Sequence, residues 1–197
     1  MFDYSAFPTL ETERLRLREI VPMDTADIFV IRGDYEVTRY NIGAAYEDAT
    51  EARDLIRTMT RLYLEAKELR WGVTLNSQYG GDDTVIGMCG FNYWHRVDRR
   101  ASIGFDLARA YWRRGIMREA VREILGFGFT EMDLNRVEAD VSVENVACIH
   151  LLKQFGFTQE GRQRQQYYDD SAFHDLLLFG LLREEWAALD AVSATVV

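Results

Sequence analysis

The stretch YWRRGIMREA, residues 111–120, ends a strand-like run and opens a helix on a glycine flanked by arginines. The first amides of a helix lack intrahelical partners and lie at the positive end of the helix dipole. Gly115 allows the backbone to approach an anion closely, and Arg113, Arg114 and Arg118 add charged donors. The stretch therefore predicts an anion site suited to a pyrophosphate, although a basic helix start on the surface would give the same short motif.

The segments on either side of this stretch predict a strand, a loop and an amphipathic helix. Residues 101–107 have the character of a strand, and Gly104 within it indicates a bulge or the close approach of another chain. Apolar residues recur at helical spacing from Ile116. Strict alternation predicts a strand over 136–143 with one buried face. A short helix capped by Asn145 follows, is stopped by a glycine at 156, and leads to another strand from 157.

The first half of the chain predicts further helices and strands. Alternation indicates a strand over 13–20, and a proline at 22 starts a helix to about 33. A second helix is expected over 47–69, with an apolar stripe along one side. Strands are expected over 70–75 and 84–94, joined by a turn-rich hairpin loop.

Composition favours one catalytic domain over 1–189 with a loose tail over 190–197. The chain has 197 residues, of which 48% are hydrophobic and 13% aromatic, enough for a sizeable core. No apolar run reaches membrane-span length and the acidic start does not resemble a signal peptide, which favours the cytoplasm. Cys89 and Cys148, the only cysteines, suggest reduced thiols rather than a disulfide or a metal site. The net charge of −9 argues against general nucleic-acid binding.

Seven short motifs in order resemble the GNAT superfamily of acetyl-CoA dependent N-acetyltransferases, and most closely its ribosomal-protein alanine and serine N-acetyltransferase branch. The resemblance extends from about Leu10 to about Trp186. The motifs are TERLRLR (12–18), IGMCGF (86–91), IGF (103–105), WRRGIM (112–117), LNRVEA (134–139), NVAC (145–148) and FGF (155–157). The resemblance implies an α/β (α+β) fold: a twisted, mixed, mostly antiparallel sheet of about seven strands, with helices on both faces and a central splay for acetyl-CoA.

The resemblance also implies which residues hold the coenzyme. The pantetheine arm is expected to pair with the strand at 103–107, and the phosphates to bind the amides of 114–117. Met117 departs from the small residue that the family usually has there, and Lys153 is the choice for the adenosine phosphates, although a solvated lysine is the alternative. The expected coenzyme-binding residues are Phe105, Asp106, Leu107, Trp112, Arg113, Arg114, Gly115, Ile116, Met117, Asn145 and Lys153.

The catalytic groups are less defined by the sequence. Cys148 stands where the branch usually carries a serine thought to act as the acid; its alternative is apolar packing on a helix face. Relatives carry an acidic base at positions that are Ser102 and Tyr167 here. The candidates for the base are therefore Asp106, Glu144, His95 and His174, or a water.

The acceptor is expected to be an amine, either a protein N-terminus such as that of a ribosomal protein or a small molecule. Glu36, Tyr40, Tyr93, Trp94 and Tyr167 are the expected acceptor-binding residues. Direct attack in a ternary complex is the expected route, without a metal, and homodimers are common in the branch. Two rivals are a CoA-binding sensor or assembly module without turnover and a nucleotide-dependent phosphotransferase. The second would require a lysine-bearing phosphate loop that this chain lacks.

Overall fold

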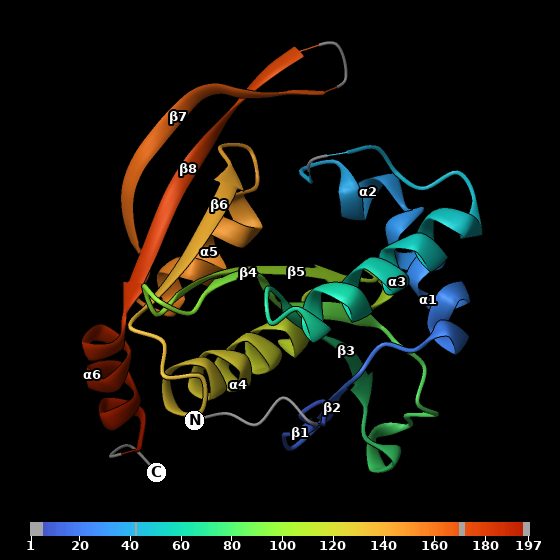
Figure 1. Ribbon diagram of the computed structural model, residues 1–197, viewed down its shortest axis with the longest axis horizontal. Helices are drawn as coiled ribbons and strands as arrows, with labels where there is room; N and C mark the ends of the chain where they lie inside the picture. Colours follow the sequence, from blue (N-terminus) through green and yellow to red (C-terminus); the bar gives the residue numbers. More distant parts are fainter. Residues whose placement is uncertain (1–5, 42, 170–171, 195–197) are drawn as a thin grey trace.

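The computed structural model describes residues 6–41, 43–169 and 172–194, with no description of the side chains of 190–194. Within these residues the strands form one eight-stranded sheet in the order β1-β2-β3-β4-β5-β6-β8-β7 (Figure 1). The strands are β1 (Leu10–Glu11), β2 (Leu15–Arg18), β3 (Leu69–Leu75), β4 (Gly87–His95), β5 (Arg100–Leu107), β6 (Arg136–Ser142), β7 (Thr158–Asp169) and β8 (Ala172–Leu182). Every strand pairing is antiparallel except that of β5 with β6.

The described residues also form six α-helices and three short 3₁₀ turns, and the last helix follows the last strand. The helices are α1 (Thr25–Arg32), α2 (Tyr35–Thr38), α3 (Ala49–Leu64), α4 (Ile116–Thr130), α5 (Val146–Gln154) and α6 (Arg183–Ala194). The 3₁₀ turns are η1 (Pro22–Asp24), η2 (Ser77–Tyr79) and η3 (Arg109–Tyr111). The mixed, mostly antiparallel sheet with helices that the sequence predicts is confirmed.

Some predicted boundaries differ from the observed ones for local reasons. The sheet has eight strands instead of about seven because the two-residue β1 adds an edge next to β2. The helix expected over 47–69 ends at Leu64, since Ala66 adopts a left-handed backbone with φ of 53°. The tail expected from 190 is helical as far as Ala194, and its last three residues, 195–197, lie outside the described residues.

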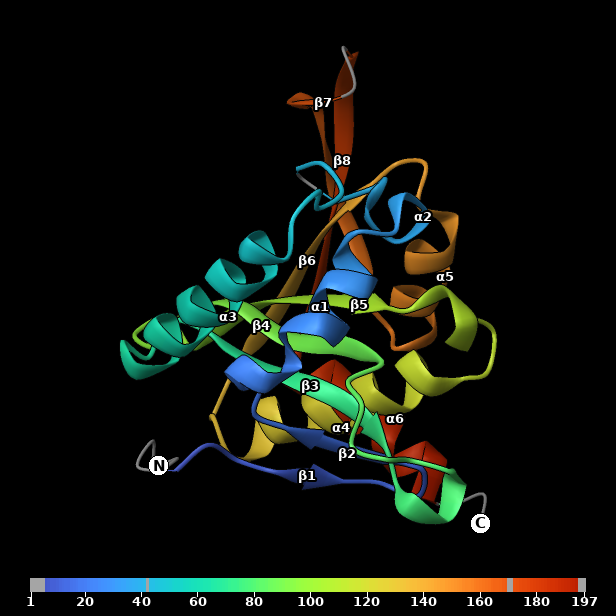
Figure 2. The ribbon, with the colours of Figure 1, turned by 90° about the vertical axis from the view of Figure 1, so that its right-hand side faces the viewer.

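Two hydrophobic cores lie on the two faces of the sheet. The main core includes the inward sides of α4, α5 and α6, and it holds Trp71 and Phe91 as its largest fully buried side chains. A second, smaller core joins α1 and α3 to the opposite face through residues such as Ile28, Ile56 and Met88. The expectation of helices on both faces is therefore confirmed (Figures 1 and 2).

The sheet is split between β5 and β6. These parallel strands pair only from Arg100 to Ser102 on β5 and from Arg136 to Glu138 on β6. Beyond this point β6 continues along β8, while the β5 segment 103–107 is paired with β4 on its other side only. The central splay that the sequence analysis expects is thus present, and it leaves one edge of β5 without a neighbouring strand.

Strands β7 and β8 form a long hairpin that projects away from the body of the molecule in both ribbon views (Figures 1 and 2). The register of β7 slips twice, between Gln159 and Gly161 and between Gln163 and Tyr167. Gln165, within the second slip, has a left-handed backbone with φ of 52°. Such bulges bend a strand, and we call this hairpin the β7–β8 arm.

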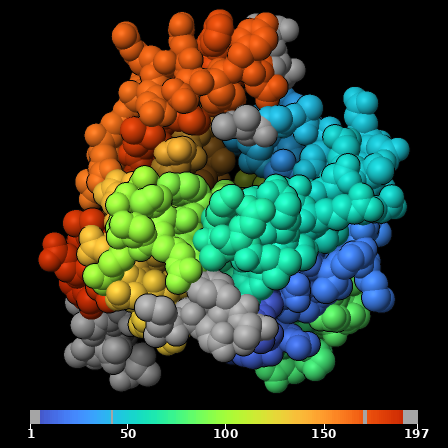
Figure 3. Space-filling model, viewed as in Figure 1, coloured from blue at the N-terminus to red at the C-terminus, as the bar shows by residue number. Residues whose placement is uncertain are grey.

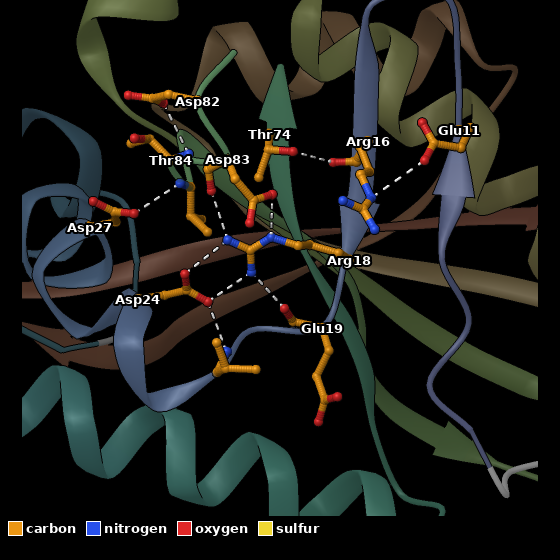
Figure 4. A network of polar contacts seen from close by, with 12 residues as sticks. Glu11, Arg16, Arg18, Glu19, Asp24, Asp27, Thr74, Asp82, Asp83 and Thr84 are labelled. Atoms are coloured by element: carbon orange, nitrogen blue, oxygen red, sulfur yellow. Dashed lines mark hydrogen bonds and ion pairs between the residues drawn. The ribbon is translucent and has the colours of Figure 1, made fainter. Parts of the chain in front are cut away.

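A buried ion pair holds in place the segment that leads from β2 into the first helices (Figure 4). Both Arg18 terminal nitrogens donate to the Asp24 carboxylate at 2.9 Å, and its Nε donates to Asp83 Oδ1 at 2.9 Å. Asp24 also accepts a hydrogen bond from the Val21 amide at 2.8 Å. The Asp24 hydrogen bonds raise the pKa of the Arg18 guanidinium. The network ties β2, η1 and the β3–β4 loop together and so sets where α1 begins.

We expect Asp24→Ala to lower the free energy of unfolding by about 3 kcal/mol, because it leaves the buried Arg18 charge without its main partner. Asp83→Ala is the control, since Asp83 is mostly exposed and its loss should cost less than about 1 kcal/mol. Urea unfolding of the two variants measures both values. Equal losses would show that the Asp24 pair does not anchor the fold.

Candidate functional site

A cavity of about 380 Å³ opens at the split between β5 and β6, a size typical of small-molecule sites. Figure 3 shows this hollow between the orange β7–β8 arm and the blue to cyan segments of α1 to α3. The cavity has walls from both sides of the sheet: Arg32, Tyr40 and Asn41; Arg70, Met88 and Asn92; residues 102–106; residues 139–142; Asn145, Cys148 and Leu176.

Strand register shows which side chains share the cavity wall on the α1 side of the sheet. Asp106 lies opposite Met88, which belongs to the α1–α3 core, and Arg32 of α1 reaches Asp106. Side chains alternate along a strand, so Ser102 shares this face. Glu138 lies opposite Ser102, which places Glu138 and then Asp140 on the same face of β6. The α1 face of the split is therefore polar.

The Asp106 carboxylate is held by two donors. Arg32 Nη1 donates to Oδ2 at 3.1 Å, and Asn41 Nδ2 donates to Oδ1 at 2.8 Å. The Arg32 guanidinium also lies over the Tyr46 ring, 5.2 Å from its centroid. Its buried Nε has no hydrogen-bond partner among the described residues. This network fixes Asp106 in the wall and leaves one buried donor beside the cavity.

Asn145 and Cys148 form the opposite wall at the start of α5. Asn145 Oδ1 accepts the Cys148 amide at 3.1 Å, which confirms the predicted cap and leaves the Asn145 amide nitrogen for other partners. Cys148 is partly buried and packs against the main core. Burial raises the pKa of its thiol to about 12, so the thiol stays protonated at neutral pH.

The start of α4 has the backbone that the anion-site prediction requires. Gly115 is the N-cap and has a left-handed φ of 73°. The first backbone bond of the helix runs from the Glu119 amide to the Gly115 carbonyl, so the amides of residues 116–118 precede the helical ladder. Arg14 donates to the Arg114 carbonyl at 2.9 Å and pairs with Glu119 at 2.6 Å. Arg14, in the segment before β2, thus anchors the loop at the start of α4.

The side chains of this loop divide into exposed and buried groups. Arg113, Arg114 and Arg118 are exposed, whereas Ile116 and Met117 are buried in the main core. Trp112 donates from its ring nitrogen to the Leu107 carbonyl at 2.7 Å and so links the loop to the end of β5. The bulk of Met117 therefore points into the core and does not obstruct the helix start.

Of the other predicted site residues, the structure brings Tyr40, Phe105 and Asp106 into the cavity together with Asn145 and Cys148. The remaining candidates outside the loop 112–117 do not line it: Glu36, Tyr93, Trp94, His95, Leu107, Glu144, Lys153, Tyr167 and His174.

Local contacts explain where several of these candidates lie. Trp94 is buried in the main core. His95 Nδ1 accepts the Asp98 amide at 3.2 Å in the β4–β5 turn. Tyr167 stacks on His174 in the β7–β8 arm, with ring centroids 5.0 Å apart. Glu36 pairs with Arg39 along α2. These groups are occupied by structural contacts.

Sequence reasoning missed several residues of the cavity wall, among them Arg32, Arg70, Asn92 and Asp140. Asn92 sits at a bulge of β4, where the register slips between residues 91 and 93. A Cβ on Gly104 would lie 2.1 Å from Asn92 Nδ2, so the glycine makes room for this side chain. A bulge leaves no clear mark in one sequence, but the alternation over 136–143 could have placed Asp140 beside Glu138 on the polar face.

Two other classes of feature are not found. In residues 6–41, 43–169 and 172–194 no group of three or more His, Cys, Asp or Glu side chains is arranged to hold a metal ion. Within the same ranges no helix is long and apolar enough to cross a membrane.

Comparison with known proteins identifies the family. Residues 14–158 match the acetyltransferase (GNAT) domain model. The chain is 37% identical over 179 residues to the N-acetyltransferase p20 of Bacillus licheniformis, described as uncharacterized; the match covers 91% of this chain and 98% of that protein.

Solved structures agree in fold. The ribosomal L7/L12 alpha-N-protein acetyltransferase RimL in complex with coenzyme A matches with a TM-score of 0.79 and 18% identity, over 89% of this chain and 98% of that one. The Vibrio cholerae spermidine N-acetyltransferase with CoA and spermine matches with a TM-score of 0.78 and 20% identity, over 89% and 99%. The domain match and the extended identity to p20 show that this chain belongs to the GNAT family and is an N-acetyltransferase.

Proposed function

We propose that this protein transfers the acetyl group of acetyl-CoA to a primary amine, with both substrates bound in the split at once. The observation that carries the proposal is the unpaired edge of β5 at 103–107, which leads toward the helix start at Gly115. An extended chain can pair with such an edge while its charged end binds a helix N-terminus.

Two parts of the structure would hold the coenzyme, the open edge of β5 and the start of α4. The pantetheine arm carries amide groups. It would lie between β5 and the Asn145 end of α5 and pair with the free backbone of β5. The phosphates would bind the amides of 116–118, with the exposed Arg113, Arg114 and Arg118 as charged donors. Lys153, exposed in the last turn of α5, is a further cation for the phosphates.

The acceptor amine would enter from the α1 face. Tyr40, Asn41 and Arg32 line that side of the cavity. The amine would therefore reach the thioester from the α1 side of the split and not by the path that the coenzyme occupies. Solved proteins of this fold include one named for a ribosomal protein and one named for spermidine, and both contain CoA. They support acceptors of two kinds, a protein N-terminus and a polyamine, for direct attack on the thioester.

Backbone donors would stabilise the charge that develops on the thioester oxygen. Amides at the open edge of β5 point into the split and are available at the moment of attack. The departing sulfur needs a hydrogen-bond donor, and Cys148 lies on the α5 wall. A thiol with a pKa near 12 is a weaker acid than an ordinary thiol of about 8.5, so Cys148 is suited to donate a hydrogen bond rather than to give up its proton.

We expect Gly115→Asp to weaken acetyl-CoA binding at least 100-fold, because it places a negative side chain at the phosphate site. Gly80→Asp is the matched control: it also substitutes a glycine of positive φ, in the β3–β4 loop, where a Cβ meets no neighbour within 4 Å. Calorimetric titration with acetyl-CoA measures both, and thermal unfolding tests that each variant folds. Unchanged affinity of the folded Gly115→Asp protein would remove the phosphate site from the proposal.

We expect Cys148→Ala to lower kcat up to about tenfold with little change in KM, since one hydrogen bond to the leaving group is lost. Cys148→Ser restores a donor and should recover most of the turnover. Because the thiol pKa lies near 12, iodoacetamide at pH 8 should alkylate Cys148 far more slowly than a free cysteine. Loss of stability with unchanged kcat would show that Cys148 serves packing alone.

A further inference from the structure

Asp140 occupies the first position of the polar face of β6 after the strands separate. The β5–β6 pairing ends at Ser102 and Glu138. Side chains alternate along β6, with Val137, Ala139 and Val141 buried in the main core, so Asp140 lies on the other side with Glu138. If the register of the last pair, Ser102 and Glu138, is extended by two residues, Asp140 lies across the split from Gly104, over which Asn92 packs. Asp140 is a lining residue of the cavity and is accessible to solvent.

The other carboxylates of this face are held by arginines. Asp106 is bound by Arg32 and Asn41. Glu138 accepts from Arg100 at 3.0 Å and from Arg136 at 2.8 Å. Each therefore has its charge balanced before any substrate arrives.

Asp140 differs from these carboxylates. In the described part of the chain it has no hydrogen-bond or ion-pair partner. Desolvation and the nearby charge of Glu138 raise the pKa of Asp140. The other charged groups that line the cavity are Arg32, Arg70 and Asp106; Arg32 pairs with Asp106 and Arg70 pairs with Glu68. On β8 the residues facing the same way as Asp140 are the uncharged Leu176, Leu178 and Gly180.

We propose that Asp140 binds the acceptor as its ammonium ion and accepts the proton that the amine must lose before attack. The inference rests on the proposed function, and it deepens that function by naming the base and the class of acceptor, a cationic primary amine. An unpaired carboxylate at the α1 face of the split is a site that a cation would complete. The acceptor enters from that same face.

The proton balance of this step is complete. The ammonium nitrogen gives one proton to the Asp140 carboxylate, which passes it to water because the side chain is accessible. The neutral nitrogen then forms a bond to the thioester carbonyl carbon, and the C–S bond breaks with its electron pair on sulfur. The second proton leaves the nitrogen and ends on the coenzyme thiol. No oxidant, reductant or metal is required.

The test compares Asp140→Asn with wild type, using acetyl-CoA and two acceptors, a short peptide beginning with serine and spermidine. We expect kcat/KM at pH 7 to fall about 100-fold for the accepted amine, a size typical of a lost general base, with unchanged affinity for acetyl-CoA. Above pH 9 more of the amine is already neutral, so the deficit should shrink. Wild type should show a rising limb at acid pH, where Asp140 ionises, that Asp140→Asn lacks; the rate of Asp140→Asn should rise only as the amine itself becomes neutral. Asp140→Glu should recover much of the rate.

The control is Asp54→Asn, which makes the same change of charge on the exposed side of α3, where Asp54 pairs with Arg57. It should leave kcat/KM and the pH profile as in wild type. Glu144→Gln tests the rival carboxylate just beyond β6; a loss there with none at Asp140 would overturn the inference.

Two further outcomes would also overturn it. One is an unchanged rate in Asp140→Asn, and the other is a deficit that stays the same from pH 6 to pH 10, since a structural role would not depend on the charge of the amine. A failure of the proposed function is seen in wild type itself: wild type would not bind acetyl-CoA, or would bind it and acetylate neither amine. Either result would also overturn the role of Asp140, whereas an active wild type with an unaffected Asp140→Asn overturns that role alone.

Discussion

The molecule depends on the loss of backbone pairing between β5 and β6. A strand interior normally satisfies its amides and carbonyls on both sides, and each unsatisfied group that is kept from water costs free energy. Here β5 is paired on both sides only as far as Ser102, and β6 then follows β8. The main core, with α4, α5 and α6, packs under strands from both halves of the sheet, and the smaller core joins α1 and α3 to the other face. The halves therefore stay in one folded body although the β5–β6 pairing ends, and the open edge of β5 offers backbone groups to an extended substrate.

The described charged side chains around the split fall into two groups, those paired within the protein and those without a charged partner. Most are paired within the protein: Arg32 with Asp106, Arg70 with Glu68, and Arg100 and Arg136 with Glu138. Those pairs fix the walls. The groups left open are the arginines at the start of α4 and Asp140 in the cavity, one set positive and one negative. An anionic coenzyme and a cationic amine would each complete one of them, the coenzyme phosphates at the start of α4 and the amine in the cavity.

Sequence patterns predicted the elements that depend on local chemistry. The glycine at 115, the Asn145 cap and the alternation over 136–143 all have the backbone expected of them. The residues that sequence reasoning missed depend on long-range contacts. Arg32 reaches β5 from α1, and Asn92 enters the cavity because β4 bulges. His95 is a candidate base because it follows Trp94 at the end of a predicted strand; the structure confirms it as the last residue of β4 but outside the cavity, with its Nδ1 accepting the Asp98 amide. One sequence without register cannot show which polar residues of different strands face one another.

Hydrogen exchange of the backbone amides with and without acetyl-CoA tests the central claim most directly. The account predicts that the coenzyme slows exchange in two segments, 103–107 on the open edge of β5 and 113–118 at the start of α4, because the ligand supplies the missing acceptors. Exchange in β3, which is paired on both sides, should change little. Binding that protects other segments and leaves both of these unchanged would contradict the claim that the split in the sheet is the coenzyme site.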